Sequence, residues 1–216
     1  MIDLSITQQF LTLAVNDKGK LSSLDQNAMV CLIAGGVIEL AQAGVVTIRD
    51  KKAETTGKLP RELEHLAPLY DYIRDKEPVK ADRIVNDFYM SFTGKRFNAL
   101  FDGVMDSLRA QGLTELVESG FLGRDRSPAP KEKAVRAVVE NLRAELLDDD
   151  PVDAETAVVA VLLDKSGDLK EHFSKDERKA MKERLKALAD TPEGKLIASA
   201  VEQVEMIAVL LLTTIF

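Results

Sequence analysis

The stretch LDQNAMVCLIAGGVIELAQA, residues 24–43, decides the fold. It is apolar on nearly every side of a helix, so we expect a central helix that is buried among other helices. Ser23 is placed to cap its start. Gly35 and Gly36 each cost about 1 kcal/mol relative to alanine inside a helix, so we expect them to let another backbone come close. Gly44 ends the predicted helix, because glycine adopts the left-handed conformation without strain.

Helical periodicity continues on both sides of this stretch, and two short segments have the character of hairpins. The apolar spacing predicts further helices at residues 4–15, 61–75, 79–91, 95–111, 131–147, 153–164, 175–189 and 193–213. Residues 45–57 and 113–127 predict the hairpins, the second of them ended by Pro128 and Pro130. The predicted fold class is therefore mainly α: one compact multi-helix domain over residues 1–216, with a central buried helix and one or two small β-hairpins.

Composition and charge narrow the class of protein. The chain has 216 residues, 45% of them hydrophobic, which excludes a largely disordered protein. A net charge of -7 opposes broad binding to nucleic acid, since phosphate backbones repel an acidic surface. The single cysteine, Cys31, excludes an intramolecular disulfide, and we expect its thiol to be buried.

The two ends of the chain bear on its location. The N-terminal sequence MIDLSITQQF has no basic segment followed by a long apolar core, so it does not predict a signal peptide. The C-terminal sequence MIAVLLLTTIF is apolar, but it is shorter than the roughly 20 residues that span a bilayer. It predicts either a buried last helix or a segment that inserts shallowly or packs on a partner. The expected location is cytoplasmic, with peripheral attachment to the inner membrane face.

The sequence holds no recognisable catalytic or metal-binding motif. HExxH, CxxC, GxSxG, the P-loop pattern and GxGxxG are all missing. The two histidines, His65 and His172, lie among charged residues, so we expect them at the surface or half-buried. We therefore expect no enzyme activity, no cofactor and no metal.

Basic residues could bind an anion in three places. Lys51 and Lys52 lie in the first hairpin, and Arg124 and Arg126 lie in the second. The third place is the pair Lys95-Arg96, in the first turn of the helix predicted at 95–111. The start of a helix offers unpaired N–H groups and a partial positive charge to a phosphate, so this pair is the candidate site for a lipid headgroup. The alternative is that the two charges only keep the surface soluble.

Three stretches resemble the Golgi phosphoprotein 3 (GPP34) family. They are FLTLAVNDKGKL at residues 10–21, LIAGGVIELAQAGVVTI at 32–48 and LRAQGL at 108–113. The resemblance implies a compact, largely helical domain with small hairpins and no enzyme activity. Eukaryotic members bind phosphatidylinositol 4-phosphate on Golgi membranes and link cargo enzymes to coats, and their hairpin is tied to self-association. A chain that begins at the first helix is similar to the bacterial branch of the family.

The residues that hold the headgroup in the family are replaced in this sequence. Alignment places the family's pocket tryptophan at Leu24 and its arginines at Ile33, Asn98 and Phe101. Each charge-assisted hydrogen bond contributes about 1.5–3 kcal/mol, so the resemblance implies a much weaker pocket here. Nearby basic side chains, Lys95-Arg96, could compensate in part.

These observations predict a binding module whose partner is an anionic membrane surface, and which forms a homo-oligomer through a β-hairpin. One alternative is a winged-helix-like regulator that meets DNA through the helix at 95–111 and the hairpin at 113–127. The net charge opposes it, as do Asp102 and Asp106 on that helix. Another alternative is a purely structural or oligomerising protein.

Overall fold

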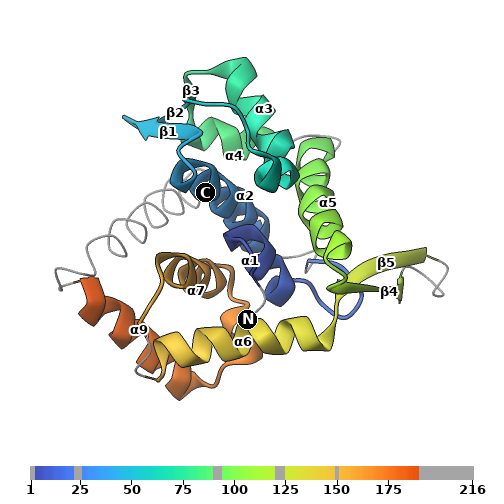
Figure 1. The fold of residues 1–216 in the computed structure, drawn as a ribbon, viewed down its shortest axis with the longest axis vertical. Helices are drawn as coiled ribbons and strands as arrows, with labels where there is room; N and C mark the ends of the chain where they lie inside the picture. Colours follow the sequence, from blue (N-terminus) through green and yellow to red (C-terminus); the bar gives the residue numbers. More distant parts are fainter. Residues whose placement is uncertain (1–2, 22–25, 90–93, 120–124, 149–150, 190–216) are drawn as a thin grey trace.

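The computed structural model describes residues 3–21, 26–89, 94–119, 125–148 and 151–189. Within these ranges the chain is mainly helical, as the sequence predicts, with nine α-helices and one 3-10 helix, η1 (Figure 1). Their bounds are α1 (Ile6–Ala14), α2 (Gln26–Gln42), η1 (Arg61–Leu66), α3 (Ala67–Lys76), α4 (Ala81–Tyr89), α5 (Lys95–Ala110), α6 (Glu132–Leu146), α7 (Ala154–Ser166), α8 (Leu169–His172) and α9 (Lys175–Ala189).

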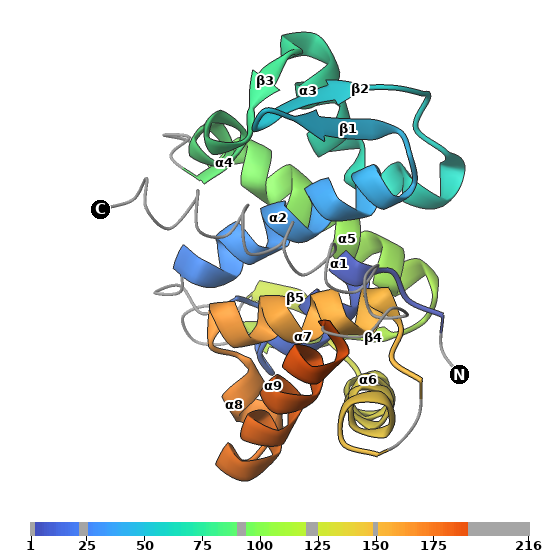
Figure 2. The ribbon, with the colours of Figure 1, turned by 90° about the vertical axis from the view of Figure 1, so that its left-hand side faces the viewer.

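Helix α2 is the central buried helix that its apolar sequence predicts. Every residue from Val30 to Leu40 is buried, because α1 and α7 cover one side while α3, α4 and a small sheet cover the other (Figure 2). The two glycines accept side chains rather than a backbone, which corrects the expectation. A β-carbon on Gly36 would lie 2.8 Å from Cδ2 of Leu69, and one on Gly35 would lie 3.1 Å from Cδ1 of Leu162. Cys31 is buried, as predicted.

The first hairpin is present and belongs to a three-stranded antiparallel sheet. Strands β1 (Val46–Arg49) and β2 (Lys52–Thr55) are joined by Asp50 and Lys51, which both have positive φ angles. Strand β3 (Val79–Lys80) pairs with β2. The helix predicted at 79–91 therefore begins only at Ala81, and Pro78 precedes a strand rather than a helix, because the backbone of residues 79 and 80 is used for strand pairing.

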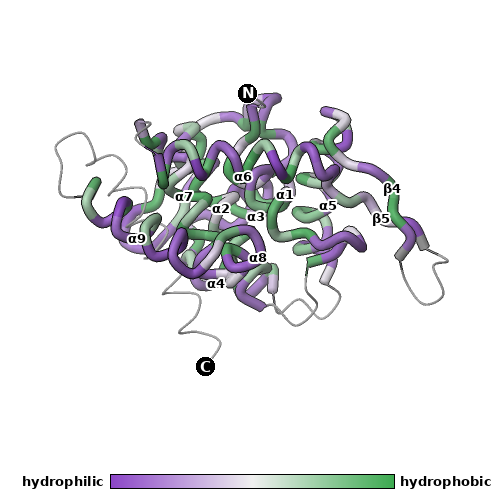
Figure 3. The backbone as a smooth tube through the Cα atoms, turned by 90° about the horizontal axis from the view of Figure 1, so that it is seen from below, coloured by the Kyte–Doolittle hydropathy of each residue, from purple (hydrophilic) through white to green (hydrophobic). Residues whose placement is uncertain are grey.

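The second hairpin is also present, but it extends further than predicted. Strand β4 (Thr114–Ser119) pairs with β5 (Asp125–Pro130), so Pro128 and Pro130 lie within the strand and do not end it. Pro128 faces Leu116 and Pro130 faces Thr114. Two residues apart, they occupy the positions whose N–H would point away from β4, where a proline costs no ladder hydrogen bond. The hairpin projects from the helical body (Figures 1 and 3).

Other predicted elements differ in extent or lie outside the described ranges. The helix predicted at 61–75 is η1 followed by α3, and the short helix α8 was not predicted. Ser23, expected to cap the helix at 24–43, and the helix predicted at 193–213 lie outside the described residues. The prediction of a single domain over residues 1–216 therefore stays a prediction. No helix in the described ranges is both long and apolar enough to cross a membrane.

Candidate functional site

The predicted headgroup residues lie in the first turn of α5, and both are exposed. The helix begins at Lys95, directly after Gly94, whose φ of 61° turns the chain into the helix. Phe97 and Leu100 start the buried face of α5, so the residues just before them point away from the core. Lys95 and Arg96 are therefore presented to solvent at a helix N-terminus, as the sequence predicts.

Arg96 is held in position by two neighbours. Its guanidinium carbon lies 5.5 Å from the centre of the Tyr72 ring, within cation–π range. Its Nη1 donates to the backbone carbonyl of Asp87 at 3.4 Å. The Tyr72 hydroxyl donates to Oδ2 of Asp87 at 2.6 Å. Burial, followed by this carboxylate, raises the pKa of Tyr72 well above its usual value, so the hydroxyl stays protonated.

The positions that align with the family's headgroup residues offer no charge here. Ile33 is 0% exposed and belongs to the core. Phe101 is half-buried, and its ring stacks on that of Phe97 with 6.4 Å between the ring centres. Asn98 is exposed. Leu24 lies outside the described residues. Ile33, Asn98 and Phe101 therefore supply no positive charge, and the cations next to Asn98 on α5 are Lys95 and Arg96.

The other two basic pairs are separate from this site. Lys51 lies in the turn between β1 and β2, and Lys52 lies on β2; both are exposed. Arg126 is exposed on β5, and Arg124 lies outside the described residues. The three basic pairs therefore belong to different elements of the fold.

A family model identifies the scaffold. The model for Golgi phosphoprotein 3 (GPP34) matches residues 6–207. The chain belongs to the Golgi phosphoprotein 3 family. The match covers every helix and strand of the described structure, including α5 and both hairpins. No curated protein matches the chain.

One histidine of this Golgi phosphoprotein 3 family member is buried, against expectation. His65 is only 8% exposed, and its Nε2 lies 3.0 Å from Oε1 of Glu39. Glu39 is itself buried and accepts hydrogen bonds from the backbone N and the hydroxyl of Thr7, both at 2.9 Å. The carboxylate thus joins the start of α1 to α2 and η1. His172 is half-buried, as expected, and its Nε2 donates to the carbonyl of Leu13 at 2.8 Å.

The cluster around His65 lacks the geometry of a catalytic triad. Ser5 Oγ and Thr7 Oγ1 lie 3.5 and 3.3 Å from Nε2, the same ring nitrogen that faces Glu39. A triad needs the nucleophile and the acid on opposite ring nitrogens. Ser5, Thr7 and Glu39 instead all face the same nitrogen of His65, so the arrangement is suited to holding α1, α2 and η1 together.

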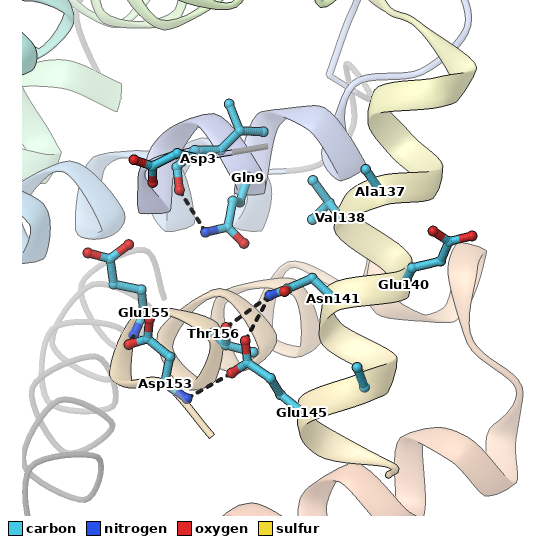
Figure 4. Close-up of a pocket in the computed structure, with 12 residues that line it drawn as sticks. Asp3, Gln9, Ala137, Val138, Glu140, Asn141, Glu145, Asp153, Glu155 and Thr156 are labelled. Atoms are coloured by element: carbon cyan, nitrogen blue, oxygen red, sulfur yellow. Dashed lines mark hydrogen bonds between the residues drawn. The ribbon is translucent and has the colours of Figure 1, made fainter. Parts of the chain in front are cut away.

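A cleft of about 630 Å³ was not predicted from the sequence. It lies between the start of α1, α6 and α7 (Figure 4). It is lined by Asp3, Leu4, Gln9, Ala137, Val138, Glu140, Asn141, Ala144, Glu145, Asp153, Glu155 and Thr156. Four of its five carboxylates lie between residues 140 and 155, and Asp3 comes from the start of the chain, so the cleft depends on the packing of α1 against α6 and α7.

The polar groups of the cleft are partly engaged with one another. Glu145 accepts from Asn141 Nδ2 at 2.9 Å and from the backbone N of Asp153 at 2.7 Å, which ties α6 to the start of α7. Burial, then Asp153, Glu39 and Asp3, raise the pKa of Glu155. Within the described residues no group of three or more acidic, His or Cys side chains could hold a metal ion.

Proposed function

We propose that this chain is a non-enzymatic binding module that attaches peripherally to the anionic inner face of a membrane, with Lys95 and Arg96 contacting lipid headgroups. The observation that carries the proposal is the exposure of both cations at the start of α5, with Arg96 already held by Tyr72 and Asp87. A side chain that is positioned before binding loses less conformational entropy when it binds.

The proposal concerns anionic or phosphoinositide-type headgroups and does not require the family's pocket. Ile33, Asn98 and Phe101 offer no cation to a headgroup, so we expect selectivity for phosphatidylinositol 4-phosphate to be weak. The lack of a triad around His65 supports the non-enzymatic part of the proposal.

Co-sedimentation with liposomes tests this function. A basic residue near an anionic surface contributes about 1 kcal/mol, so Lys95→Ala/Arg96→Ala should weaken binding by roughly 30-fold. Lys133→Ala/Arg136→Ala removes the same charge from exposed positions of α6 and serves as the control. Equal binding by the two double variants would refute the role of Lys95 and Arg96.

The projecting hairpin supports a second function, self-association. Leu116 on β4 is 61% exposed. Among the described residues it is the one large hydrophobic side chain exposed to solvent. We propose that the β4–β5 hairpin contacts a second copy of the chain through the face that carries Leu116. Light scattering at rising concentration should show a dimer or larger species that Leu116→Ser lowers to monomer. A monomer in the wild-type protein would dispose of the proposal.

A DNA-binding role has less support. The winged-helix alternative would present α5 beside the β4–β5 hairpin to a phosphate backbone. The face of α5 carries exposed Asp102 and Asp106, and Asp106 already pairs with Arg109 at 3.1 Å. We therefore expect no shift of DNA in a gel at low salt, where electrostatic binding is strongest.

A further inference from the structure

The cleft between the start of α1, α6 and α7 is large enough to hold a small molecule (Figure 4). Its volume of about 630 Å³ lies within the range of about 300–1,000 Å³ that is usual for small-molecule sites. Leu4, Val138 and Ala144 contribute apolar walls. The cleft therefore offers a ligand apolar contact as well as polar groups.

The cleft carries more negative charge than the described cations around it neutralise. Its carboxylates belong to Asp3, Glu140, Glu145, Asp153 and Glu155. None of the five forms an ion pair with a described residue. Burial, followed by neighbouring carboxylates and by no cation, raises the pKa of Glu155. These acidic groups therefore act on one another without a counter-charge between them.

The cations of α6 are engaged elsewhere or lie beside the cleft. Arg136 pairs with Glu132 at 2.6 Å, and Arg143 pairs with Glu177 of α9 at 2.8 Å. Lys133 is exposed one turn before the first residue of α6 that lines the cleft. Even when Lys133 is counted against the five carboxylates, an excess of four negative charges remains.

The uncharged polar groups of the cleft also present acceptors. Nε2 of Gln9 donates to the carbonyl of Leu4 at 2.8 Å. Nδ2 of Asn141 donates to Glu145 at 2.9 Å and to the hydroxyl of Thr156 at 3.3 Å. Because both amide nitrogens are engaged within the protein, the amide oxygens of Gln9 and Asn141 are left to accept from a ligand. Charge and hydrogen-bonding capacity therefore both favour a ligand that is positively charged and rich in N–H donors.

The carboxylates are spread along the cleft rather than gathered around one point. Figure 4 shows Asp3 and Glu155 at one side and Glu140 at the opposite side. No group of three or more acidic, His or Cys side chains in the described ranges could hold a metal ion. Ammonium groups separated by methylene chains fit this spacing better than one compact ion does, because the methylene groups can pack on the apolar walls.

We propose that this cleft binds a linear aliphatic polyamine. Its ammonium groups contact the carboxylates and the two amide oxygens, and its methylene groups pack on Leu4, Val138 and Ala144. The site belongs to α1, α6 and α7, whereas Lys95 and Arg96 lie on α5. It is therefore independent of the membrane function, and liposome binding and polyamine binding can succeed or fail separately.

Isothermal titration calorimetry with two double variants tests the site. Asp3→Asn/Glu155→Gln removes two carboxylates of the cleft and keeps the shape of both side chains. Neither carboxylate accepts a hydrogen bond from a described residue, so we expect this variant to fold, which circular dichroism checks. Glu115→Gln/Glu118→Gln removes the same charge from exposed positions of β4 and is the control.

Four probes separate a polyamine site from other ways of binding a cation. They are spermidine, in which methylene chains separate the ammonium groups; n-butylamine, with a single ammonium group; Mg²⁺, a compact dication; and trilysine, a basic peptide. Wild type and control should bind spermidine with one molecule per chain, and at least about tenfold more tightly than n-butylamine, by the usual strength of a charge-assisted hydrogen bond. Asp3→Asn/Glu155→Gln should bind spermidine about tenfold or more weakly.

Several results would overturn the proposal. An equal loss of spermidine affinity in both double variants would mean that the acidic protein attracts cations without a site. Displacement of spermidine by an equal concentration of Mg²⁺ would mean that charge alone decides binding. Trilysine that bound more tightly than spermidine, and lost that binding in Asp3→Asn/Glu155→Gln, would assign the cleft to a basic peptide. No heat of binding with spermidine would rule the site out.

Discussion

The buried carboxylate of Glu39 offers the sharpest test of how the scaffold is held together. Replacing it by alanine removes the acceptor of the backbone N and the hydroxyl of Thr7, both at 2.9 Å, and the partner of His65 Nε2 at 3.0 Å. The Thr7 hydroxyl and His65 Nε2, 3.3 Å apart, are then left to each other, and the backbone N of Thr7 loses its acceptor. All three groups are buried. An unsatisfied buried donor costs about 1–3 kcal/mol, and relaxation of the freed side chains recovers part of that sum. We expect Glu39→Ala to lower the free energy of unfolding by about 3–5 kcal/mol.

The assay follows from the composition of the chain. There is no tryptophan, so unfolding in urea is best followed by far-ultraviolet circular dichroism. For a chain of this size 1 kcal/mol corresponds to about 2–4 °C in Tm, so the melting temperature should fall by roughly 10 °C. Glu64→Ala is the control, since Glu64 is an exposed acid on η1, and it should stay within about 0.5 kcal/mol of wild type.

A double-mutant cycle locates the effect. Thr7→Val removes the hydroxyl but keeps the shape of the side chain. If Glu39 and Thr7 interact as their distances indicate, the two substitutions should be non-additive by about 1 kcal/mol or more. A loss below 1 kcal/mol for Glu39→Ala, or an additive cycle, would refute the reasoning.

Three further predictions concern other parts of the fold. Gly103→Ala should lower the free energy of unfolding by up to about 2 kcal/mol, because the new β-carbon would lie 2.6 Å from the backbone O of His65. This strain exceeds the gain in helix propensity from glycine to alanine, about 1 kcal/mol. A higher melting temperature for the variant would contradict this prediction. Hydrogen bonds from Ser174 and Arg143 lower the pKa of Glu177 to about 2 from its ordinary 4.5. The stability that Glu177 adds should be present above pH 4.5 and should disappear as the pH falls toward 2. The free energies of unfolding of wild type and Glu177→Gln, measured by urea titration, should therefore become equal at low pH. Burial raises the pKa of Glu155, so its charge opposes folding at neutral pH. Glu155→Gln should stabilise there, and the gain should vanish as the pH falls toward 4.5; a gain that grew in acid would contradict it.

The sequence predicts the helices well where many apolar residues recur at helical spacing. Helix α2 needed no tertiary information, because nearly all its positions are apolar. Strand β3 was missed because two residues carry no periodicity, and only the pairing with β2 defines it. The extent of β5 was missed because prolines usually end a strand, and their register against β4 decides whether they can be accommodated.

The candidate sites were predicted only where neighbours in sequence are also neighbours in space. Lys95 and Arg96 could be placed at a helix start because both lie in one turn. His65 was expected near the surface because charged residues surround it in sequence, but its partner Glu39 lies 26 positions away on α2. Packing between helices decides such contacts, and a single sequence does not show it.

The same distinction explains why family membership fixes the scaffold more firmly than the ligand. The stretch at 32–48 that carries the resemblance includes Glu39 and the glycines that receive Leu69 and Leu162, all of which hold α2 in place. Asn98 is exposed and contributes little to that packing, so the fold permits many side chains there. The helices α3, α4 and α5 can therefore keep their arrangement while the cations that face solvent change position. In this chain two solvent-facing cations, Lys95 and Arg96, lie in the first turn of α5, next to the exposed Asn98.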